Sequence, residues 1–143
     1  MTRSDVVAQR QPLRLALAWG PALLYTVAIW IASSLPHLQV PLDRVPWRDK
    51  GVHFVEYAVL GALVVRGALR TWPLVSRVRL LLLSWTATAI WGLIDEIHQA
   101  FVPGRLADVA DVVADVLGGV AGVAVAGLLS WLAARRSPRT HEA

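Results

Sequence analysis

Acidic residues are concentrated in two short segments of this 143-residue chain, each beside a hydrophobic run. Eight of the ten Asp and Glu residues fall within 43–56 and 95–115. Ionisable side chains are costly within a membrane, and they usually mark a functional site there. Histidine, lysine and arginine lie among these carboxylates. Such a mixture could bind an anion, hold a metal ion or transfer protons.

Three sets of these residues have spacings of three and four, which would place each set on one face of a helix. The sets are Lys50, His53, Glu56 and Tyr57; Asp95, His98 and Gln99; and Asp108, Asp111 and Asp115. Glu96 would point about 100° away from Asp95 on the same helix. The spacing thus predicts three polar stripes on three helices.

Chain direction would bring the three stripes to the same end of a helix bundle. We expect a shallow layer of Lys50, His53, His98, Arg105 and Asp108. We expect a deeper layer of Glu56, Tyr57, Asp95, Asp111 and Asp115. The histidine and carboxylate of 53–56 would face those of 95–98. Together the two layers would form one polar cup.

Four hydrophobic segments are long enough to cross a bilayer, which takes about 20 helical residues. They predict helices over about 13–34, 49–70, 78–99 and 108–134. The predicted fold class is therefore all-α, a polytopic membrane helix bundle with four transmembrane helices. The uncharged part of the third segment, 80–94, spans only about 22 Å. Asp95 must then lie within the membrane zone. The predicted transmembrane domain covers residues 13–134. We expect cytoplasmic tails at 1–12 and 135–143, and we expect the second tail to be disordered.

Basic residues predict the orientation, because cytoplasmic loops carry an excess of Lys and Arg. Ten of the fourteen basic residues lie in the two tails and the 66–79 region, on one side of the predicted bundle. Both termini are therefore predicted to be cytoplasmic in the cell membrane, with the polar cup facing outward. The apolar runs argue against nucleic-acid binding despite a net charge of +4, and the absence of cysteine excludes disulfide and thiolate chemistry.

The connections and one stripe of small residues complete the prediction. Pro103-Gly104 predicts a tight turn, and the proline-rich stretch 35–48 predicts an extended connection. A four-residue repeat of small residues lets helix backbones approach closely, and the repeat here is Ala114, Gly118, Gly122 and Ala126. Its partner helix lies either in the same chain or, through Gly118 and Gly122, in a second copy as a homo-oligomer.

Two motifs resemble the VanZ-like family of small bacterial membrane proteins. They run from Asp49-Lys50 through His53-Phe54 and Tyr57 to Gly61, and from Asp95-Glu96 through His98-Gln99, Phe101, Pro103-Gly104-Arg105 and Asp108 to Asp111. The resemblance implies about four helices, a bacterial envelope protein and, for the family's namesake, low-level resistance to the glycopeptide teicoplanin. The resemblance does not imply a particular chemical reaction. Asp115 is a departure, because the resemblance leads us to expect Asn there.

The leading hypothesis is a protein that binds or acts on a membrane lipid or lipid-linked envelope precursor through its head group. Acid–base roles would fall to Glu56, Asp95, Glu96, His98 and Asp111. Ligand binding would fall to Lys50, His53, Tyr57, Gln99, Arg105, Asp108 and Asp115. Any cofactor is unknown.

Three alternatives stay open. A metal-dependent hydrolase could use the His/carboxylate pairs 53–56 and 95–98, which suit Zn, Mn or Fe. A proton or ion path is less well supported, because the fourth helix is wholly apolar beyond Asp115. A non-catalytic accessory subunit would leave the motifs unexplained.

Overall fold

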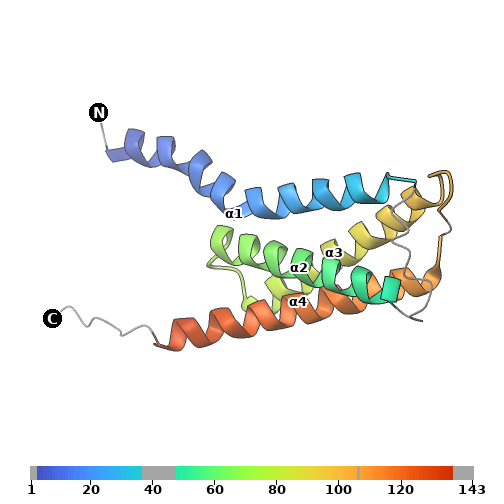
Figure 1. The fold of residues 1–143 in the computed structure, drawn as a ribbon. Helices are drawn as coiled ribbons and strands as arrows, with labels where there is room; N and C mark the ends of the chain where they lie inside the picture. Colours follow the sequence, from blue (N-terminus) through green and yellow to red (C-terminus); the bar gives the residue numbers. More distant parts are fainter. Residues whose placement is uncertain (1–2, 37–47, 106, 137–143) are drawn as a thin grey trace.

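Four long helices make up the described part of the protein (Figure 1). The computed structural model describes residues 3–36, 48–105 and 107–136. The helices are α1 (Arg3–Ser33), α2 (Arg48–Thr71), α3 (Arg77–Gln99) and α4 (Val109–Arg136). Each contains a segment long and apolar enough to cross a membrane. The prediction of an all-α bundle with four membrane-spanning helices is confirmed.

The helix bounds agree with the sequence except at the start of α1. Helices α2, α3 and α4 begin and end within two residues of the predicted bounds. Helix α1 begins ten residues earlier than expected, at Arg3, although its apolar span, Gln11–Ser33, matches the prediction. Pro12 and Pro21 lie inside α1, and Figure 1 shows a bend in this helix, as prolines within helices produce. The predicted extended connection falls mostly on 37–47, outside the described residues.

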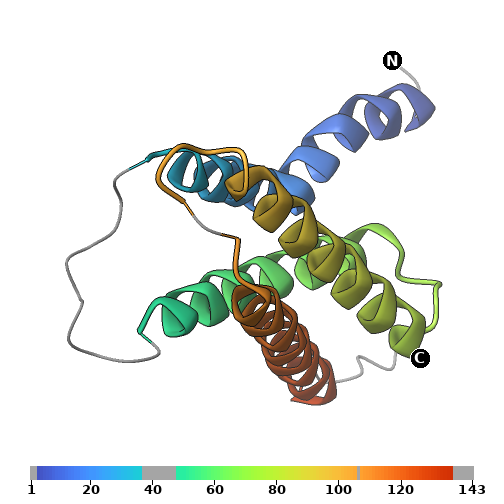
Figure 2. The same ribbon diagram turned by 90° about the vertical axis from the view of Figure 1, so that its right-hand side faces the viewer.

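Helix α2 occupies the centre of the bundle and contacts each of the other helices. Figure 2 shows α1 and α4 on opposite sides of α2, and these two do not touch within the described residues. Because α2 carries Lys50 and His53 near its start, a central α2 holds these side chains among the helix ends that surround it.

The contact between α2 and α4 depends on glycine. A Cβ added at Gly118 or Gly122 would overlap the backbone carbonyl group of Phe54 or Ala58. Small residues allow the two helix backbones to approach this closely. In a membrane the hydrophobic effect does not drive helices together, so close van der Waals packing is a main source of their association. The stripe therefore meets α2 of its own chain. Helix α2 covers Gly118 and Gly122, the two positions where the sequence allowed a second copy to dock.

Hydrogen bonds join the helices at the end away from the clustered acids. Trp19 Nε1 donates to Thr71 Oγ1 at 2.8 Å and so joins α1 to α2. Arg77 donates to the Gly127 carbonyl at 2.8 Å and so joins α3 to α4. These contacts fix the helix pairs at one end, while the acidic residues gather at the other.

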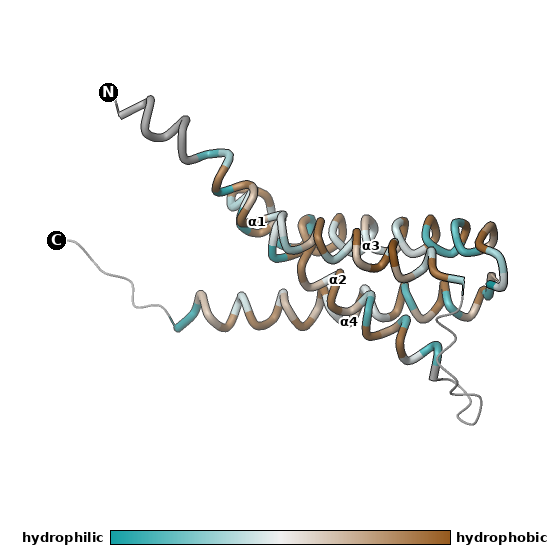
Figure 3. The backbone as a smooth tube through the Cα atoms, turned by 45° about the horizontal axis from the view of Figure 1, so that its top comes forward, coloured by the Kyte–Doolittle hydropathy of each residue, from teal (hydrophilic) through white to brown (hydrophobic). Residues whose placement is uncertain are grey.

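A tight turn shapes the acidic end. The Arg105 amide donates to the Val102 carbonyl at 3.1 Å, and Gly104 has a φ of 85°, as the predicted Pro103-Gly104 turn requires. The turn is confirmed. It directs the chain back after α3, so that Arg105 lies against the helix ends. Figure 3 shows hydrophilic residues gathered at this end, whereas the middle of the bundle is mostly hydrophobic.

The N-terminal part of α1 and the C-terminal part of α4 lie at the same end of the bundle, on opposite sides of it (Figure 1). We expect both termini to be cytoplasmic, because the 66–79 connection at that end is rich in arginine. Reporter fusions at Ala143 and within 40–47 would measure this. A fusion at Ala143 that reports export would contradict the orientation and the outward placement of the acidic end.

Candidate functional site

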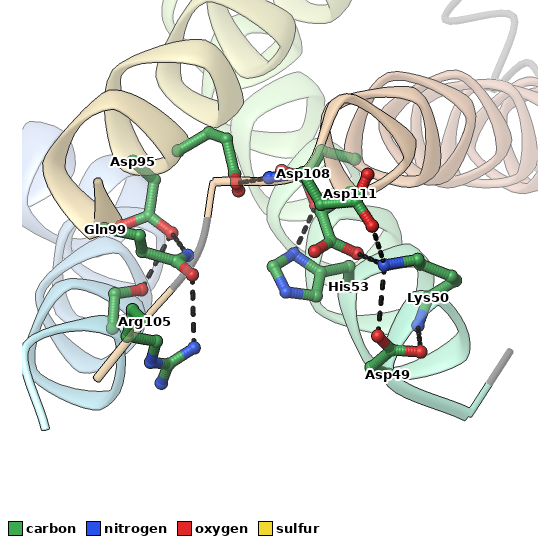
Figure 4. Close-up of polar contacts among 11 residues, drawn as sticks. Asp49, Lys50, His53, Asp95, Gln99, Arg105, Asp108 and Asp111 are labelled. Atoms are coloured by element: carbon green, nitrogen blue, oxygen red, sulfur yellow. Dashed lines mark hydrogen bonds and ion pairs between the residues drawn. The ribbon is translucent and has the colours of Figure 1, made fainter. Parts of the chain in front are cut away.

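The polar side chains at the acidic end form two groups (Figure 4). The first, called here the Arg105 group, joins α1, the end of α3 and the following turn; it consists of Ser33, Asp95, Gln99 and Arg105. The second, the His53 group, joins α2, α3 and α4; it consists of Lys50, His53, Glu96, Asp108, Asp111 and Asp115.

A chain of hydrogen bonds orders the Arg105 group. Asp95 Oδ2 accepts from Ser33 Oγ at 2.7 Å and from Gln99 Nε2 at 3.0 Å. The carboxylate thereby fixes the Gln99 amide, whose Oε1 accepts from Arg105 Nη1 at 3.1 Å. Asp95 is only 1 % exposed, so these bonds stand in for the water that Oδ2 has lost, while Oδ1 is buried without a hydrogen-bond partner in the described structure.

Arg105 is half-buried and is held by neutral oxygen atoms alone. Its second contact is from Nη2 to the Ala32 carbonyl at 3.1 Å. Within the described residues, no carboxylate lies at ion-pair distance from this guanidinium. Arginine has five N–H donors in a fork that matches phosphate and carboxylate. The arrangement therefore keeps a charged donor available to an anion.

His98 lies near the end of α3, and its side chain packs against α1. Its ring stacks on Trp30 with the centroids 4.0 Å apart, and Nε2 lies 2.9 Å from Ser34 Oγ. The Ser34 hydroxyl donates to the Trp30 carbonyl at 2.7 Å, so it accepts from His98. Because His98 is a donor here, it does not activate Ser34 as a nucleophile.

Lys50 is surrounded by carboxylates. Its Nζ lies 3.0 Å from Asp49, 2.6 Å from Asp108 and 2.8 Å from Asp111. The hydrogen bond from Lys50, with a second from the Ala110 amide, lowers the pKa of Asp108 below its usual range. Lys50 thus bridges the starts of α2 and α4, and its charge is already used within the protein.

Two buried carboxylates and a half-buried histidine meet near Lys50, one from each of α2, α3 and α4. His53 Nδ1 lies 3.0 Å from Asp115 Oδ1, and Glu96 Oε1 accepts from the Asp108 amide at 2.6 Å. His53, Glu96 and Asp115 each offer one metal-ligating atom, and these three atoms lie within 4.8 Å of one another. A buried His/Glu/Asp group is therefore present in this protein.

The remaining predicted residues are Glu56 and Tyr57. Tyr57 is fully buried beside Ile29 and Leu60, and its hydroxyl has no hydrogen-bond partner in the described structure. Glu56 is half-buried and makes no hydrogen bond to another described residue, although it interacts electrostatically with His53 and Asp95. The ligand-binding role predicted for Tyr57 and the acid–base role predicted for Glu56 stay predictions.

The sequence placed the residues at one end, and the structure adds contacts with α1 that the spacing did not predict. Asp95 contacts Ser33 and His98 contacts Ser34, while Asp95 also interacts electrostatically with Glu56 of the 53–56 face. The two predicted layers also merge, since Lys50 reaches Asp111, which had been assigned to the deeper layer. Hydrogen bonds thus divide the predicted cup into two groups, and Asp95 of one group still interacts electrostatically with Asp115 of the other. The facing of the His/carboxylate pairs stays a prediction.

Sequence reasoning missed the contribution of α1 and one glycine. Trp30, Ser33 and Ser34 contact the predicted site residues, and a Ser-Ser pair at the end of an apolar run was the available signal. A Cβ on Gly92 would lie 2.9 Å from Asp115 Cβ and 3.1 Å from Tyr57 Cε1. Gly92 thus makes room for the buried acid, and no spacing rule would have identified it.

The fold and the site together define a multi-span helical membrane protein with a buried polar site at one end of its bundle. Residues 8–130 match the model of the VanZ/LLP1 family, and the chain belongs to that family. The resemblance seen in the two sequence motifs is thereby confirmed. Searches of curated proteins and of solved structures returned no match.

Proposed function

We propose that this VanZ/LLP1 protein binds a phosphate-bearing head group, from a membrane lipid or a lipid-linked envelope precursor, at the outward-facing acidic end. The observation that carries the proposal is the environment of Arg105. Its guanidinium is half-buried, is positioned by Gln99 and the Ala32 carbonyl, and has no described carboxylate within ion-pair distance. Glu56 interacts with it electrostatically from farther away. Charge-assisted bonds from arginine to phosphate are among the stronger polar contacts in proteins.

The other basic group at this end is less suited to the role. Lys50 already contacts three carboxylates, so an added phosphate would have to compete with them. Lys50, Asp108 and Asp111 are therefore proposed to border the head-group site and to keep α2 and α4 together. Gln99 is proposed to orient Arg105, and Asp95 to orient Gln99.

Acid–base work is assigned in this proposal to Glu56. Its carboxyl group is half-buried and free of hydrogen bonds within the described structure, whereas Asp95 and Glu96 each accept at least one. A general acid or base must reach its proton with a group that is not already held elsewhere. His98 and Asp111 are engaged with Ser34 and Lys50, which favours positioning roles for them.

Head-group binding is testable with the full chain purified in detergent. Polyprenyl phosphate and phosphatidylglycerol would be titrated separately and followed by tryptophan fluorescence. Loss of one charge-assisted contact costs about 1.5–3 kcal/mol, so Arg105→Ala is expected to weaken binding by about tenfold or more. Arg105→Lys keeps the charge and should retain part of the affinity.

The two lipids distinguish a lipid-linked precursor from an ordinary phospholipid as the source of the phosphate. The matched control is Arg70→Ala, which removes an exposed arginine at the opposite end of α2. Equal losses in Arg105→Ala and Arg70→Ala, or no saturable binding of either lipid by the native chain, would contradict the proposal.

A further inference from the structure

The side chains of His53, Glu96 and Asp115 form a cluster that takes no part in the proposed head-group binding by Arg105. They come from α2, α3 and α4, and one ligating atom of each lies within 4.8 Å of the other two. Glu96 is 4 % exposed and Asp115 is 1 % exposed. Burying two carboxylates together is costly unless positive charge or hydrogen-bond donors compensate for the lost water.

The protein supplies only part of that compensation. Glu96 Oε1 accepts from the Asp108 amide and Asp115 Oδ1 is paired with His53. The second oxygens, Glu96 Oε2 and Asp115 Oδ2, are buried without a hydrogen-bond partner in the described structure. Buried polar atoms are nearly always satisfied, so two orphaned carboxylate oxygens in one place indicate a missing partner.

The surrounding charges indicate that this partner is positive. The side chains described at this end include seven carboxylates, namely Asp49, Glu56, Asp95, Glu96, Asp108, Asp111 and Asp115. The Lys and Arg side chains described there are Lys50 and Arg105, and His53 is the histidine beside Asp115. Lys50 is committed to Asp49, Asp108 and Asp111, and Arg105 contacts Gln99 and a backbone carbonyl. Neither is therefore positioned to neutralise Glu96 and Asp115.

We propose that His53, Glu96 and Asp115 bind one divalent transition-metal ion. An imidazole nitrogen suits Zn²⁺ and Fe²⁺, and carboxylate oxygens suit Mn²⁺ and also ligate Zn²⁺. Catalytic zinc sites typically have three protein ligands and a fourth position open to water or substrate. Metal–ligand distances of about 2.0–2.2 Å require the three atoms to close by roughly an ångström. Each lies on a side chain, so rotation can supply this closure.

An ion at this position would account for two features of the site. It would bond the orphaned oxygens of Glu96 and Asp115, and it would take the place of the hydrogen bond between His53 Nδ1 and Asp115 Oδ1. Its open coordination position would be available to an oxygen of an anion. Metal ions bind phosphoryl oxygens at such a position. Gly92 contributes by leaving space for the Asp115 side chain.

Zinc binding can be measured on the full chain, purified in detergent through a tag without histidine and stripped with a chelator. Titration with ZnCl₂ by calorimetry, and metal content after dialysis, should give about one ion per chain. Asp115→Asn, Glu96→Gln and His53→Ala should each lower the affinity by at least about tenfold. Asp49→Asn is the matched control, because it removes an exposed acid at the same end.

The competing explanation is a proton held between Glu96 and Asp115, and it predicts no stoichiometric zinc uptake by the native chain. That result would overturn the proposal whether or not the variants fold. Equal weakening by Asp49→Asn and Asp115→Asn would overturn it too, because binding would then follow surface charge alone. The metal site rests on the proposed function only because both sites are placed at the acidic end of the bundle. Zinc is titrated without added lipid, so either proposal can fail alone.

Discussion

Replacing Gly122 with leucine is expected to prevent the chain from accumulating as a folded bundle. Even the first added carbon would overlap the Ala58 carbonyl of α2, and backbone cannot move aside as a flexible side chain can. The smaller change Gly122→Ala should lower stability by at least about 1–3 kcal/mol, the usual range for overpacking. The effect is large because α2 contacts every other helix, so separating α2 from α4 disturbs the site as well as the bundle.

The measurements are the yield of monodisperse protein in detergent and its thermal unfolding midpoint. Gly20→Ala is the matched control: it makes the same chemical change inside a membrane-spanning helix, where an added Cβ meets nothing within 4 Å. It should leave the midpoint unchanged or raise it slightly, because alanine favours helix over glycine by about 1 kcal/mol. If Gly122→Ala behaved like Gly20→Ala, the close α2–α4 contact would not support the fold.

The helices were predictable because hydrophobic length and charge placement decide them. Bounds for α2, α3 and α4 fell within two residues, since Asp49, Arg77 and Arg136 lie where the apolar runs stop. The turn at Pro103-Gly104 was predictable for a local reason, the positive φ that glycine adopts without strain.

The pairing of faces was less predictable, because helical spacing shows which residues share a face and not which helix that face meets. Asp95 and Gln99 do share a face, as their 3.0 Å hydrogen bond shows, but that face meets α1. Glu96, one residue on, turns toward α2 and α4 and joins His53 and Asp115. Gly118 and Gly122 bring α4 close to α2, and Ser33 of α1 contacts Asp95 on α3.

The two groups divide the chemistry of the acidic end. The Arg105 group holds a cation on neutral acceptors, which favours an anion. The His53 group holds buried carboxylates with unsatisfied oxygens, which favours a cation. Both groups lie at the acidic end of the bundle, where the head-group site and the metal site are proposed.

Expression of the chain in a susceptible Gram-positive host is expected to raise tolerance to teicoplanin more than to vancomycin. The expectation rests on the proposed outward-facing head-group site and on the teicoplanin resistance associated with the namesake of the family, which is a property of that protein. The acyl chain of teicoplanin anchors the drug in the outer leaflet through its buried CH₂ groups. A protein that acts on head groups in that leaflet should affect an anchored drug more than an unanchored one.

Asp95→Asn and Arg105→Ala are each expected to abolish this tolerance while membrane levels stay unchanged. Arg105→Ala removes the anion-binding group. Asp95→Asn keeps the size of the side chain but removes the charge that fixes Gln99 and, through Gln99, Arg105. Minimum inhibitory concentrations of both drugs, with immunoblots of membrane fractions and Arg70→Ala as control, measure the effect. Tolerance that survives both substitutions would exclude the Arg105 group as the working site. Equal tolerance to both drugs would indicate a general response of the envelope, because drug anchoring would then make no difference.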